Sequence, residues 1–462
     1  ELFSSTGHFE ECRPLILDVY SHEIEKSGEW PQWFMLDKYA FAADDCHGDI
    51  VFWPLRILAD YLKKSGDSAI LNAVLPFQDS LEKSTLEKHM SLSLEAVERR
   101  FIPGTDFISY GGGDWDDTLQ PADPTMKSRL VSPWTQELAY QTLKELASVL
   151  PAGHAKEECL LLSARLKKGY DEHFLDHGEI PGFLYVKEDG TLNRLVTSKD
   201  ETTGIHYRLL PYTRAIISGL ASKEDAHAFS QLISEKLAFP DGVRLMDRPA
   251  HYDGGVNHLF VRAEEASNVG REISLCYIHA DIRYAESMCR LGDGVKALDA
   301  LKKINPINLD AIVKNAAPRQ SNAYFSSSDP DFNDRYDFAK GIEKLRKGEV
   351  KVRGGWRVYS SGNGIYIARL IGDLFGLKPE KNALLIDPVL APSLDESVVD
   401  VDFGYGLYHF HYHLGSKGYG VKAILLDGNE LKLNRLENPY REGGVVYPLT
   451  EKNAHDFDVY TF

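Results

Sequence analysis

Apolar residues stand at helical spacing in the stretch Leu55-Arg56-Ile57-Leu58-Ala59-Asp60-Tyr61-Leu62, and Gly66 follows where such a helix would end. Long loops rich in glycine and aromatic residues separate similar stretches. The same periodicity predicts further helices over 86–101, 133–150, 155–174, 212–222, 226–237, 279–291 and 365–374. The sequence therefore predicts a mainly α fold, in which paired helices form a toroid whose loops build one rim.

The pattern changes after about residue 380. Short β-rich runs at 398–403, 405–414, 421–426 and 444–447 are separated by turn sequences such as Asp427-Gly428-Asn429. We therefore expect a helical domain over 1–385 and a small β-sandwich module over 386–462. His409, His411 and His413 would share one face of a strand. This spacing suits a metal site, although it is more typical of a solvated polar face.

The composition of the 462-residue chain limits the classes of protein to which it can belong. Hydrophobic residues make up 43% and aromatic residues 11%, which is typical of a globular protein and excludes a largely disordered one. Acidic residues outnumber basic ones by 69 to 52, giving a net charge of -17. This balance argues against nucleic-acid and anionic-membrane partners, although a local basic pocket could still bind phosphate or a sugar phosphate.

Cysteine usage and apolar runs indicate the compartment. The five cysteines are scattered and include no Cys-x-x-Cys pair, which argues against a disulfide framework and a zinc site. No apolar run approaches the roughly 20 residues that span a bilayer. We therefore expect a soluble, cytoplasmic protein with no membrane partner and no nucleic-acid partner.

An acidic tract stands out from the rest of the chain, with the sequence Gly111-Gly112-Gly113-Asp114-Trp115-Asp116-Asp117-Thr118-Leu119. It puts three carboxylates and an indole behind a flexible glycine run. In a sugar-cleaving site one acid protonates the glycosidic oxygen, other acids accept hydrogen bonds from hydroxyls, and an indole stacks on the ring. A surface Asx-turn loop or a calcium loop would use the same residues.

Further sequence blocks accompany this tract, namely Gly270-Arg271-Glu272-Ile273, His279, residues 319–329 and residues 354–362. With them, the chain resembles glycoside hydrolase family 94 over roughly residues 10–395. That is the family of cellobiose phosphorylase and its relatives acting on β-glucan oligosaccharides. The resemblance implies an (α/α)6 barrel. The family also carries an upstream block rich in arginine and aspartate, which is not found here, so we expect the C-terminal part of a larger protein.

The resemblance assigns the acid and the sugar-binding residues. Asp117, at the end of the Asp-Trp-x-Asp block, corresponds to the general acid, and Asp49 to a carboxylate that binds the donor sugar. Asp114 and Trp115 are further candidates for substrate binding. A general acid needs a pKa raised by a poorly solvated site and by neighbouring negative charge, which Asp114 and Asp116 could supply. The structural alternative is that Asp117 only caps the following segment.

The resemblance also implies a phosphate site. His279, which leads into a predicted helix, matches a phosphate-binding histidine of the family. Ser361 and Gly362 match a small hydroxyl residue and a glycine, and backbone N–H groups before a helix suit an anion. A histidine at a helix start is commonly a structural hydrogen-bonding residue, and Ser361-Gly362-Asn363-Gly364 could be an ordinary N-cap.

Other residues near these blocks have weaker assignments. Arginines beside them could add phosphate contacts or form structural salt bridges. Aromatic residues could line the cleft or belong to the core, and two further acids have no assigned role. These residues are Arg271, Arg319, Arg357, Tyr324, Trp356, Tyr359, Asp44 and Asp45.

The expected activity is that of an inverting phosphorylase. Orthophosphate, as co-substrate, would attack the terminal glucosyl unit of a β-linked gluco-oligosaccharide and give α-glucose 1-phosphate, with no metal or organic cofactor. The blocks are more similar to members acting on longer chains, such as β-1,2-oligoglucans, while β-1,3-glucan and cellobiose-type substrates stay open. The alternatives are an inverting hydrolase on the same barrel and a non-catalytic carbohydrate-binding portion. A homodimer is compatible with the resemblance.

Overall fold

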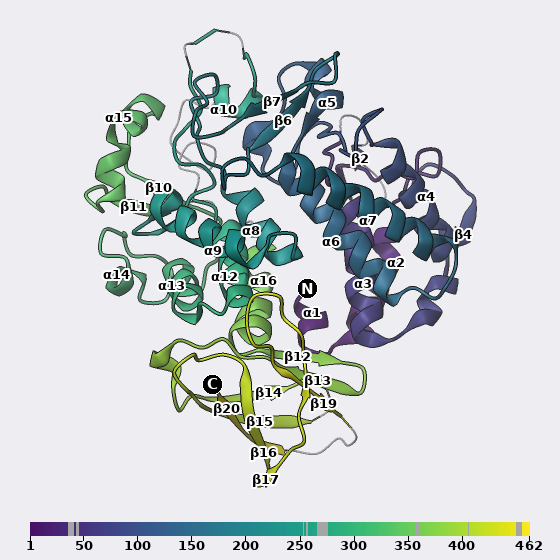
Figure 1. Cartoon of the computed structure of the whole chain (residues 1–462), viewed down its shortest axis with the longest axis vertical. Helices are drawn as coiled ribbons and strands as arrows, with labels where there is room; N and C mark the ends of the chain where they lie inside the picture. The colour runs from purple at the N-terminus through teal and green to yellow at the C-terminus, as the bar shows by residue number, and fades with distance from the viewer. Residues whose placement is uncertain are drawn as a thin grey trace.

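Helices dominate the chain up to residue 374 and strands dominate from residue 377, so that the strands form a separate layer beneath the helical region (Figure 1). The computed structural model describes residues 1–35, 41–42, 46–252, 254–255, 257–265, 276–355, 361–404, 406–449 and 455–462, with the backbone alone at 41, 42, 265 and 361. Among these residues, none of the helices is both long and apolar enough to span a bilayer.

The longer inner helices of the helical region pack in sequence order. They are α3 (Phe52–Ser65), α6 (Pro133–Val149), α8 (Leu209–Ser218), α12 (Ile278–Leu291) and α16 (Ser361–Arg369). Each contacts the next, and the short helix α1 (Leu2–Ser5) contacts both α16 and α3, which closes the ring. In α6 and α12 side chains on almost every face are buried, as expected for helices surrounded by other helices.

Outer helices pair with members of this ring. α2 (Phe9–Tyr20) packs on α3, α7 (His154–His173) on α6, α9 (Lys223–Leu232) on α8, and α13 (Gly294–Ile304) on α12. α4 (Leu86–Arg99) lies against α2 and α7. The helical pairing that the sequence predicts is therefore present. The predicted ranges match these helices to within a few residues, except that α2 and α13 were not predicted.

Local signals set the helix ends. α3 stops at Gly66, whose positive φ of 62° gives the left-handed cap that glycine adopts most readily. Thr85 caps α4 by accepting a hydrogen bond from the Lys88 amide at 3.3 Å. Asp293 caps α13 in the same way through the Lys296 amide at 3.0 Å. These caps reverse the chain, so that successive helices run back along one another.

Shorter elements lie in the loops. The short helices are α5 (Pro124–Arg129), α10 (Val261–Glu265), α14 (Leu309–Ile312) and α15 (Arg335–Arg346). The 3-10 turns are η1 (Ser68–Asn72), η2 (Asp117–Leu119) and η5 (Pro392–Leu394), and π turns η3 (Ile233–Leu237) and η4 (Leu370–Leu374) extend α9 and α16. The small sheets contain β1 (Trp33–Phe34), β2 (Phe41–Ala42), β3 (Val74–Pro76), β4 (Lys83–Thr85), β5 (Leu130–Val131), β6 (Phe183–Val186), β7 (Leu192–Leu195), β8 (Ala238–Phe239), β9 (Gly242–Val243), β10 (Ser328–Pro330) and β11 (Val352–Gly354).

The β module consists of two sheets. One has the order β12 (Leu377–Glu380), β13 (Ala383–Ile386), β19 (Val445–Pro448), β18 (Asn434–Arg435). The other has the order β14 (Val398–Asp402), β15 (Leu407–His413), β20 (His455–Thr461), β16 (Val421–Leu426), β17 (Asn429–Glu430). Tyr447 of the first sheet meets Phe457 of the second with ring centroids 5.3 Å apart, as in a sandwich. The first sheet begins at Leu377, so the expected domain boundary after residue 385 falls within β13.

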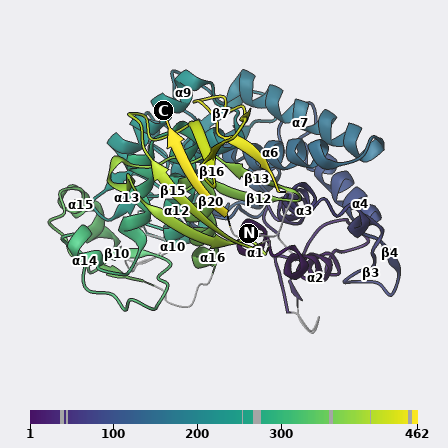
Figure 2. The same cartoon turned by 90° about the horizontal axis from the view of Figure 1, so that it is seen from below.

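The module lies across one end of the helical region (Figure 2) and contacts the C-terminal ends of α8 and α12. The buried Tyr440 hydroxyl donates to the Ile216 carbonyl of α8 at 3.3 Å and to the Ala221 carbonyl at 3.1 Å. Arg441 donates to the Cys289 carbonyl of α12 at 3.1 Å and pairs with Asp387. These contacts fix the module at one end of the ring and leave the N-terminal ends of the helices for a site.

Candidate active site

A cavity of about 200 Å³ lies at the end of the ring where α3 and α12 begin. Its walls combine carboxylates, an imidazole and indole rings. They include Gln32, His47, Asp49, Trp53, Trp115, Asp116, Asp117 and Tyr277. The cavity therefore brings together Asp49, Trp115 and Asp117, three of the residues that the sequence predicts to act on a sugar.

Asp114 holds the acidic tract in place through hydrogen bonds to buried neighbours. Arg208 Nη2 donates to both of its carboxylate oxygens, at 2.9 and 2.8 Å, and Ser132 Oγ donates to Oδ2 at 2.9 Å. The Asp116 amide donates to Asp114 Oδ1 at 3.0 Å. Asp114 is fully buried and is not among the described cavity-lining residues, so its geometry favours holding the tract over the sugar contact expected from the sequence. The guanidinium also occupies the oxygens that a calcium ion would need.

Asp116 lies between this anchor and the cavity. Its Oδ1 accepts a hydrogen bond from the Thr118 amide at 3.2 Å, while Oδ2 has no hydrogen-bond partner within the described part of the chain. Burial raises its pKa above the usual range of an aspartate. Asp116 therefore has the poorly solvated environment that the sequence analysis expected for the general acid, although Arg208 Nη2 also lies 3.7 Å from its Oδ2.

Asp117 itself lies in a different environment. It begins η2, its side chain is 28% exposed, and its Oδ2 accepts a hydrogen bond from Arg262 Nη1 of α10 at 2.8 Å. His47 Nδ1 is 3.9 Å from the other oxygen. The sequence predicted a poorly solvated site with mainly negative neighbours, whereas a guanidinium and solvent both reach Asp117.

Asp49 is the most deeply buried carboxylate of the cavity wall, with only 1% of its surface exposed. Trp53 Nε1 donates to Oδ2 at 2.9 Å, and no hydrogen-bond partner for Oδ1 is found among the described residues. Burial, assisted by the charge of Asp114, raises the pKa of Asp49 to about 7. A carboxyl group with an unsatisfied oxygen facing a polar cavity is suited to accept hydrogen bonds from sugar hydroxyls.

The glycine run joins the two acidic segments. The Gly48 amide donates to the Gly113 carbonyl at 2.8 Å, and the Gly112 amide donates to the Cys46 carbonyl at 3.1 Å. Gly113 has a φ of 151°, and a Cβ atom there would lie only 3.0 Å from the His47 ring. Glycine is therefore required at this position for His47 and Asp49 to approach the tract.

Sequence reasoning did not assign a role to His47. Its ring is buried in the cavity wall, with Nε2 2.9 Å from Gln120 Nε2, and burial lowers its pKa. The His47-Gly48-Asp49 tripeptide was a signal that could have identified it. Arg208 and Arg262 were missed as well, and they lie 94 and 145 residues from the aspartates that they pair with.

His279 packs behind the cavity at the start of α12. Its ring contacts the edge of Trp115 with centroids 4.6 Å apart, and Trp115 also contacts Tyr277 at 5.0 Å. Burial lowers the pKa of His279 to about 3, so the imidazole is neutral at physiological pH. Its Nδ1 has no hydrogen-bond partner within the described residues, and an unsatisfied buried nitrogen at this point is available to an incoming ligand.

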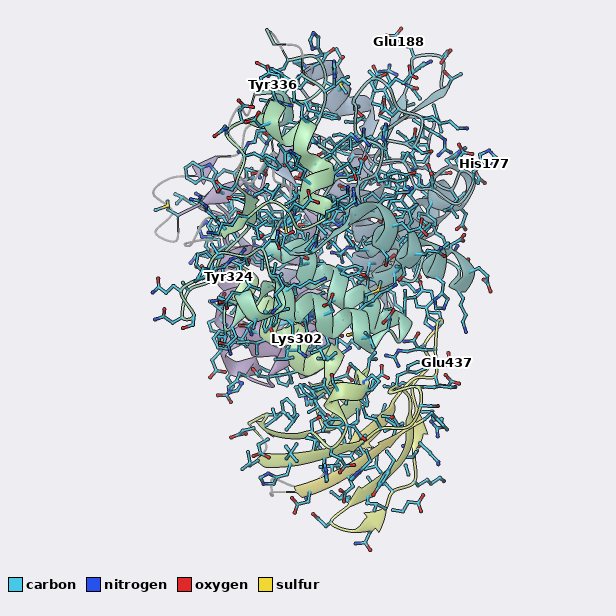
Figure 3. The ribbon with its side chains drawn as sticks, turned by 90° about the vertical axis from the view of Figure 1, so that its left-hand side faces the viewer. His177, Glu188, Lys302, Tyr324, Tyr336 and Glu437 are labelled. Carbon is cyan, nitrogen blue, oxygen red and sulfur yellow. The ribbon has the colours of Figure 1, made fainter. Side chains whose placement is uncertain are left out.

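Ser361 and Gly362 form the first turn of α16, which begins four residues earlier than the sequence predicted and packs against α12. A side chain at Gly362 would collide with the Tyr324 hydroxyl, so glycine allows the Tyr324 ring to cover this helix start. The Tyr324 hydroxyl is buried without a partner among the described residues. Figure 3 shows Tyr324 in the helical region, away from the β module.

Of the remaining sequence candidates, the structure describes only Arg319, which is not among the described residues that line the cavity. Arg319 Nη2 donates to Ser328 Oγ at 2.9 Å, and its guanidinium lies over the Phe325 ring, which is a structural arrangement. The other candidates lie outside the residues that the structure describes. They are Asp44, Asp45, Arg271, Trp356, Arg357 and Tyr359.

A larger cavity, of about 560 Å³, lies between the helical region and the β module. Many of its charged residues are paired with one another. Arg283 and Arg369 contact Glu286 at 2.7 and 3.1 Å, and Lys64 contacts Asp60 at 3.0 Å. Paired charges at a domain junction indicate a structural interface, and the smaller cavity carries the unsatisfied acids.

Comparison with known proteins identifies the family of the chain. Residues 24–331 match the model of the glycosyl hydrolase 94 superfamily, catalytic domain. The chain is 42% identical over 458 residues to a 1,2-beta-oligoglucan phosphorylase of Listeria innocua serovar 6a, covering 97% of this chain and 41% of that protein. It is 26% identical to a 3-O-beta-D-glucopyranosyl-beta-D-glucuronide phosphorylase of Paenibacillus borealis, covering 92% of this chain and 52% of that protein.

The chain thus spans about half the length of these relatives, or less. Among solved structures, a GH78 family rhamnosidase of Bacillus sp. GL1 aligns with 12% identity and a TM-score of 0.43, covering 81% of this chain and 33% of that one. The matched family segment contains Asp49, the acidic tract and His279, and therefore most of the site. The chain belongs to the glycosyl hydrolase 94 superfamily and contains its catalytic domain.

Proposed function

We propose that this protein is an inverting phosphorylase that cleaves a β-linked gluco-oligosaccharide with orthophosphate to give α-glucose 1-phosphate. The observation that carries the proposal is the cavity that joins Asp49, Trp115 and Asp117, with His279 packed against Trp115. The closed order of helices from α1 to α16 supports the (α/α)6 barrel for the helical region. The scattered cysteines fit a cytoplasmic protein.

Asp117 is the proposed general acid. It lines the cavity at the position that the family resemblance assigns to the acid, and its side chain is open enough to reach a bound substrate. Arg262 now holds its carboxylate, and a proton donor must be protonated. Donation to the glycosidic oxygen therefore requires that a bound sugar replace the Arg262 contact.

Phosphate is proposed to bind where α12 and α16 begin. The neutral His279 ring can donate one N–H group. The amides of Ser361 and Gly362 lie in the first turn of α16, where N–H groups have no acceptor within the helix. The positive ends of two adjacent helix dipoles favour an anion there. Because phosphate is itself the nucleophile, the site needs no second carboxylate to activate water.

The sugar is proposed to contact Asp49 and Trp115. Asp49 offers an unsatisfied oxygen to hydroxyl groups, and Trp115 is held in place by the rings of Tyr277 and His279. Asp114 then affects sugar binding only indirectly, because its bond with Arg208 holds the acidic tract in place. The printed name of the relative at 42% identity supports β-1,2-linked oligoglucans as the substrate. The proposed reaction uses orthophosphate and requires no metal or organic cofactor.

Inverting hydrolysis is the second candidate, and one observation favours it. Asp49 lines the same cavity as Asp117, so a second carboxylate is present that could activate water. Its raised pKa of about 7 leaves it partly protonated at neutral pH, which weakens it as a base.

An assay with a panel of β-1,2-, β-1,3- and β-1,4-linked gluco-oligosaccharides, with and without phosphate, separates these functions. We expect glucose 1-phosphate only in the presence of phosphate, and mostly from the β-1,2 series. Equal release of glucose in phosphate-free buffer would support the hydrolase. Neither product under either condition would contradict both candidates.

A further inference from the structure

The exposed face of β15 carries a cluster that the proposed phosphorolysis does not use. His411 and His413 lie two residues apart and therefore share one face of the strand. Glu396, in the turn before β14, reaches this face, and Asp458 of β20 stands opposite His411 in the parallel register. The sequence showed only the alternating histidines, whereas the structure adds the two carboxylates.

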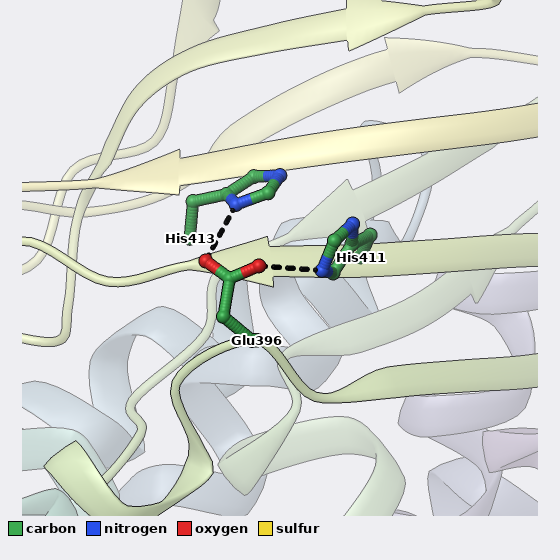
Figure 4. A group of neighbouring side chains, drawn as sticks. All are labelled: Glu396, His411 and His413. Atoms are coloured by element: carbon green, nitrogen blue, oxygen red, sulfur yellow. Dashed lines mark hydrogen bonds and ion pairs between the residues drawn. The ribbon is translucent and has the colours of Figure 1, made fainter.

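The Glu396 carboxylate lies between the two imidazoles (Figure 4). Its Oε2 is 2.9 Å from His411 Nε2, and its Oε1 is 2.9 Å from His413 Nδ1. The three candidate ligand atoms all lie within 4.8 Å of one another. Ligands around a tetrahedral zinc ion are about 3.4 Å apart, given metal–ligand bonds of about 2.1 Å, so small side-chain rotations would enclose an ion.

Asp458 contacts the opposite nitrogen of each ring. Its Oδ1 is 3.1 Å from His413 Nε2 and 3.5 Å from His411 Nδ1. A histidine that binds a metal through one nitrogen commonly donates the other N–H to a carboxylate, which fixes the tautomer and the ring orientation. Asp458 is therefore placed to orient both histidines so that the other ring nitrogen of each faces Glu396. Ion pairs between exposed side chains do not by themselves require this shared orientation.

The backbone holds Glu396 in position. The Glu396 amide donates to the Tyr412 carbonyl at 2.9 Å, and the Tyr412 amide donates back to the Ser397 carbonyl at 3.0 Å. The Leu414 amide donates to Asp395 Oδ1 at 2.8 Å. The turn is thus tied to β15 on both sides of His413, so the backbone that carries Glu396 is fixed relative to the strand that carries the imidazoles.

We propose that Glu396, His411 and His413 form a binding site for a divalent transition-metal cation, with Asp458 as the carboxylate that orients both histidines. Two imidazoles and a carboxylate are the ligands that Zn²⁺, Co²⁺ and Ni²⁺ accept, whereas Mg²⁺ and Ca²⁺ prefer oxygen ligands alone. The two carboxylates carry the charge that a divalent ion would neutralise. The site lies on the β module, at the end opposite the cavity, so it does not depend on the proposed enzyme activity.

Isothermal titration of the whole chain tests the site directly. The protein is purified without a polyhistidine tag, stripped with a chelator, and titrated with ZnCl₂ or MgCl₂. We expect saturable binding of one Zn²⁺ per chain and none of Mg²⁺. The His411→Ala/His413→Ala variant should lose this binding. Asp458→Asn, which leaves all three ligands in place, should weaken it by about 10- to 100-fold.

Control variants separate a built site from any exposed histidine. His409→Ala is matched, because His409 lies on the same face of β15 and contacts its own carboxylate, Asp400, at 2.6 Å. His177→Ala removes an 88% exposed histidine at the edge of the helical region (Figure 3). Both should bind zinc as the parent does.

Two outcomes would overturn the proposal. One is equal zinc affinity in the parent and in a folded His411→Ala/His413→Ala variant, with His411→Gln as a milder second variant if the first melts early. The other is no saturable binding by the parent, which would mean that the cluster is a set of ion pairs only. An Asp458→Asn variant with unchanged affinity would remove the orienting role of that residue.

Discussion

The cavity region and the exposed face of β15 both place imidazoles near carboxylates, yet the two environments shift the pKa values of these groups in opposite directions. In and behind the cavity, burial raises the pKa of Asp49 to about 7 and lowers that of His279 to about 3. On β15, the hydrogen bond to Asp400 raises the pKa of the exposed His409. Desolvation favours the neutral form of both groups in the cavity, whereas charge pairing favours the charged forms at the surface.

This difference indicates where substitutions should matter. A buried group without its partner loses both solvent and the compensating charge, so its removal affects stability, activity or pH dependence. An exposed pair exchanges its partner for water at little cost. The same residue types are therefore expected to have large effects in the helical region and small ones on the β module.

The largest effect is expected at the cavity. Asp117→Asn should lower the phosphorolysis rate by a factor on the order of 100 to 10,000, because the amide cannot donate the proton of a general acid. Initial rates at saturating oligosaccharide and phosphate measure this. Asp123→Asn is a suitable control, since Asp123 is an exposed cap of α5 that is not among the described cavity-lining residues. Retention of more than about a tenth of the rate would move the role to Asp116 or Asp49.

The next effect is on stability. Arg208→Met should lower the free energy of unfolding by about 3–5 kcal/mol, because it leaves Asp114 buried without its partner. Chemical denaturation measures it. Lys417→Ala, which removes the exposed pair with Glu442 on the β module, should leave the unfolding transition unchanged. If Arg208→Met and Lys417→Ala change the free energy of unfolding by similar amounts, burial does not account for the difference between the two regions.

A smaller effect is expected at the anion site. His279→Ala should raise the KM for phosphate by about 10- to 150-fold, the cost of losing a hydrogen bond to a charged group. The KM for the oligosaccharide should change far less. Measuring both constants and the melting temperature distinguishes this role from a structural one. A lower melting temperature with equal changes in both constants would assign His279 to the core.

The last expected effect is a change in pH dependence. Because the pKa of Asp49 rises from 3.8 to about 7 on folding, the folded state binds more protons than the unfolded state between these values. Stability should therefore fall as pH rises from about 4 to 7, and Asp49→Asn should remove that contribution. Melting temperatures of both proteins across this range measure it. Parallel curves would contradict the raised pKa.

The sequence was informative where signals are local. The apolar spacing and caps predicted α4, α6, α7 and α12 closely, and the glycine run drew attention to the tract that lines the cavity. It missed β12 and β13, which are only four residues long and of which β13 pairs with the distant β19, and it missed β20, which pairs with the distant β15. Pairing between strands that are far apart in the sequence gives no local sequence pattern from which it could be predicted.

The same limit applies to the site. Asp114 and Asp117 were identified from neighbouring residues, but the guanidinium groups that pair with them come from the start of α8 and from α10. The sequence predicted a poorly solvated pocket around Asp117, whereas the structure shows an ion pair between Asp117 and Arg262. Likewise, Glu396 and Asp458 meet His411 and His413 only because β15 lies between two other strands.

The stereochemistry of the reaction is the most direct test of the proposed function. Proton NMR can follow the anomeric signals while the protein acts on β-1,2-linked gluco-oligosaccharides in phosphate buffer. We expect α-glucose 1-phosphate as the first product, with none formed when phosphate is omitted or when Asp117 is replaced by Asn. Glucose as the first product in the absence of phosphate, or β-glucose 1-phosphate in its presence, would contradict inverting phosphorolysis in this cavity.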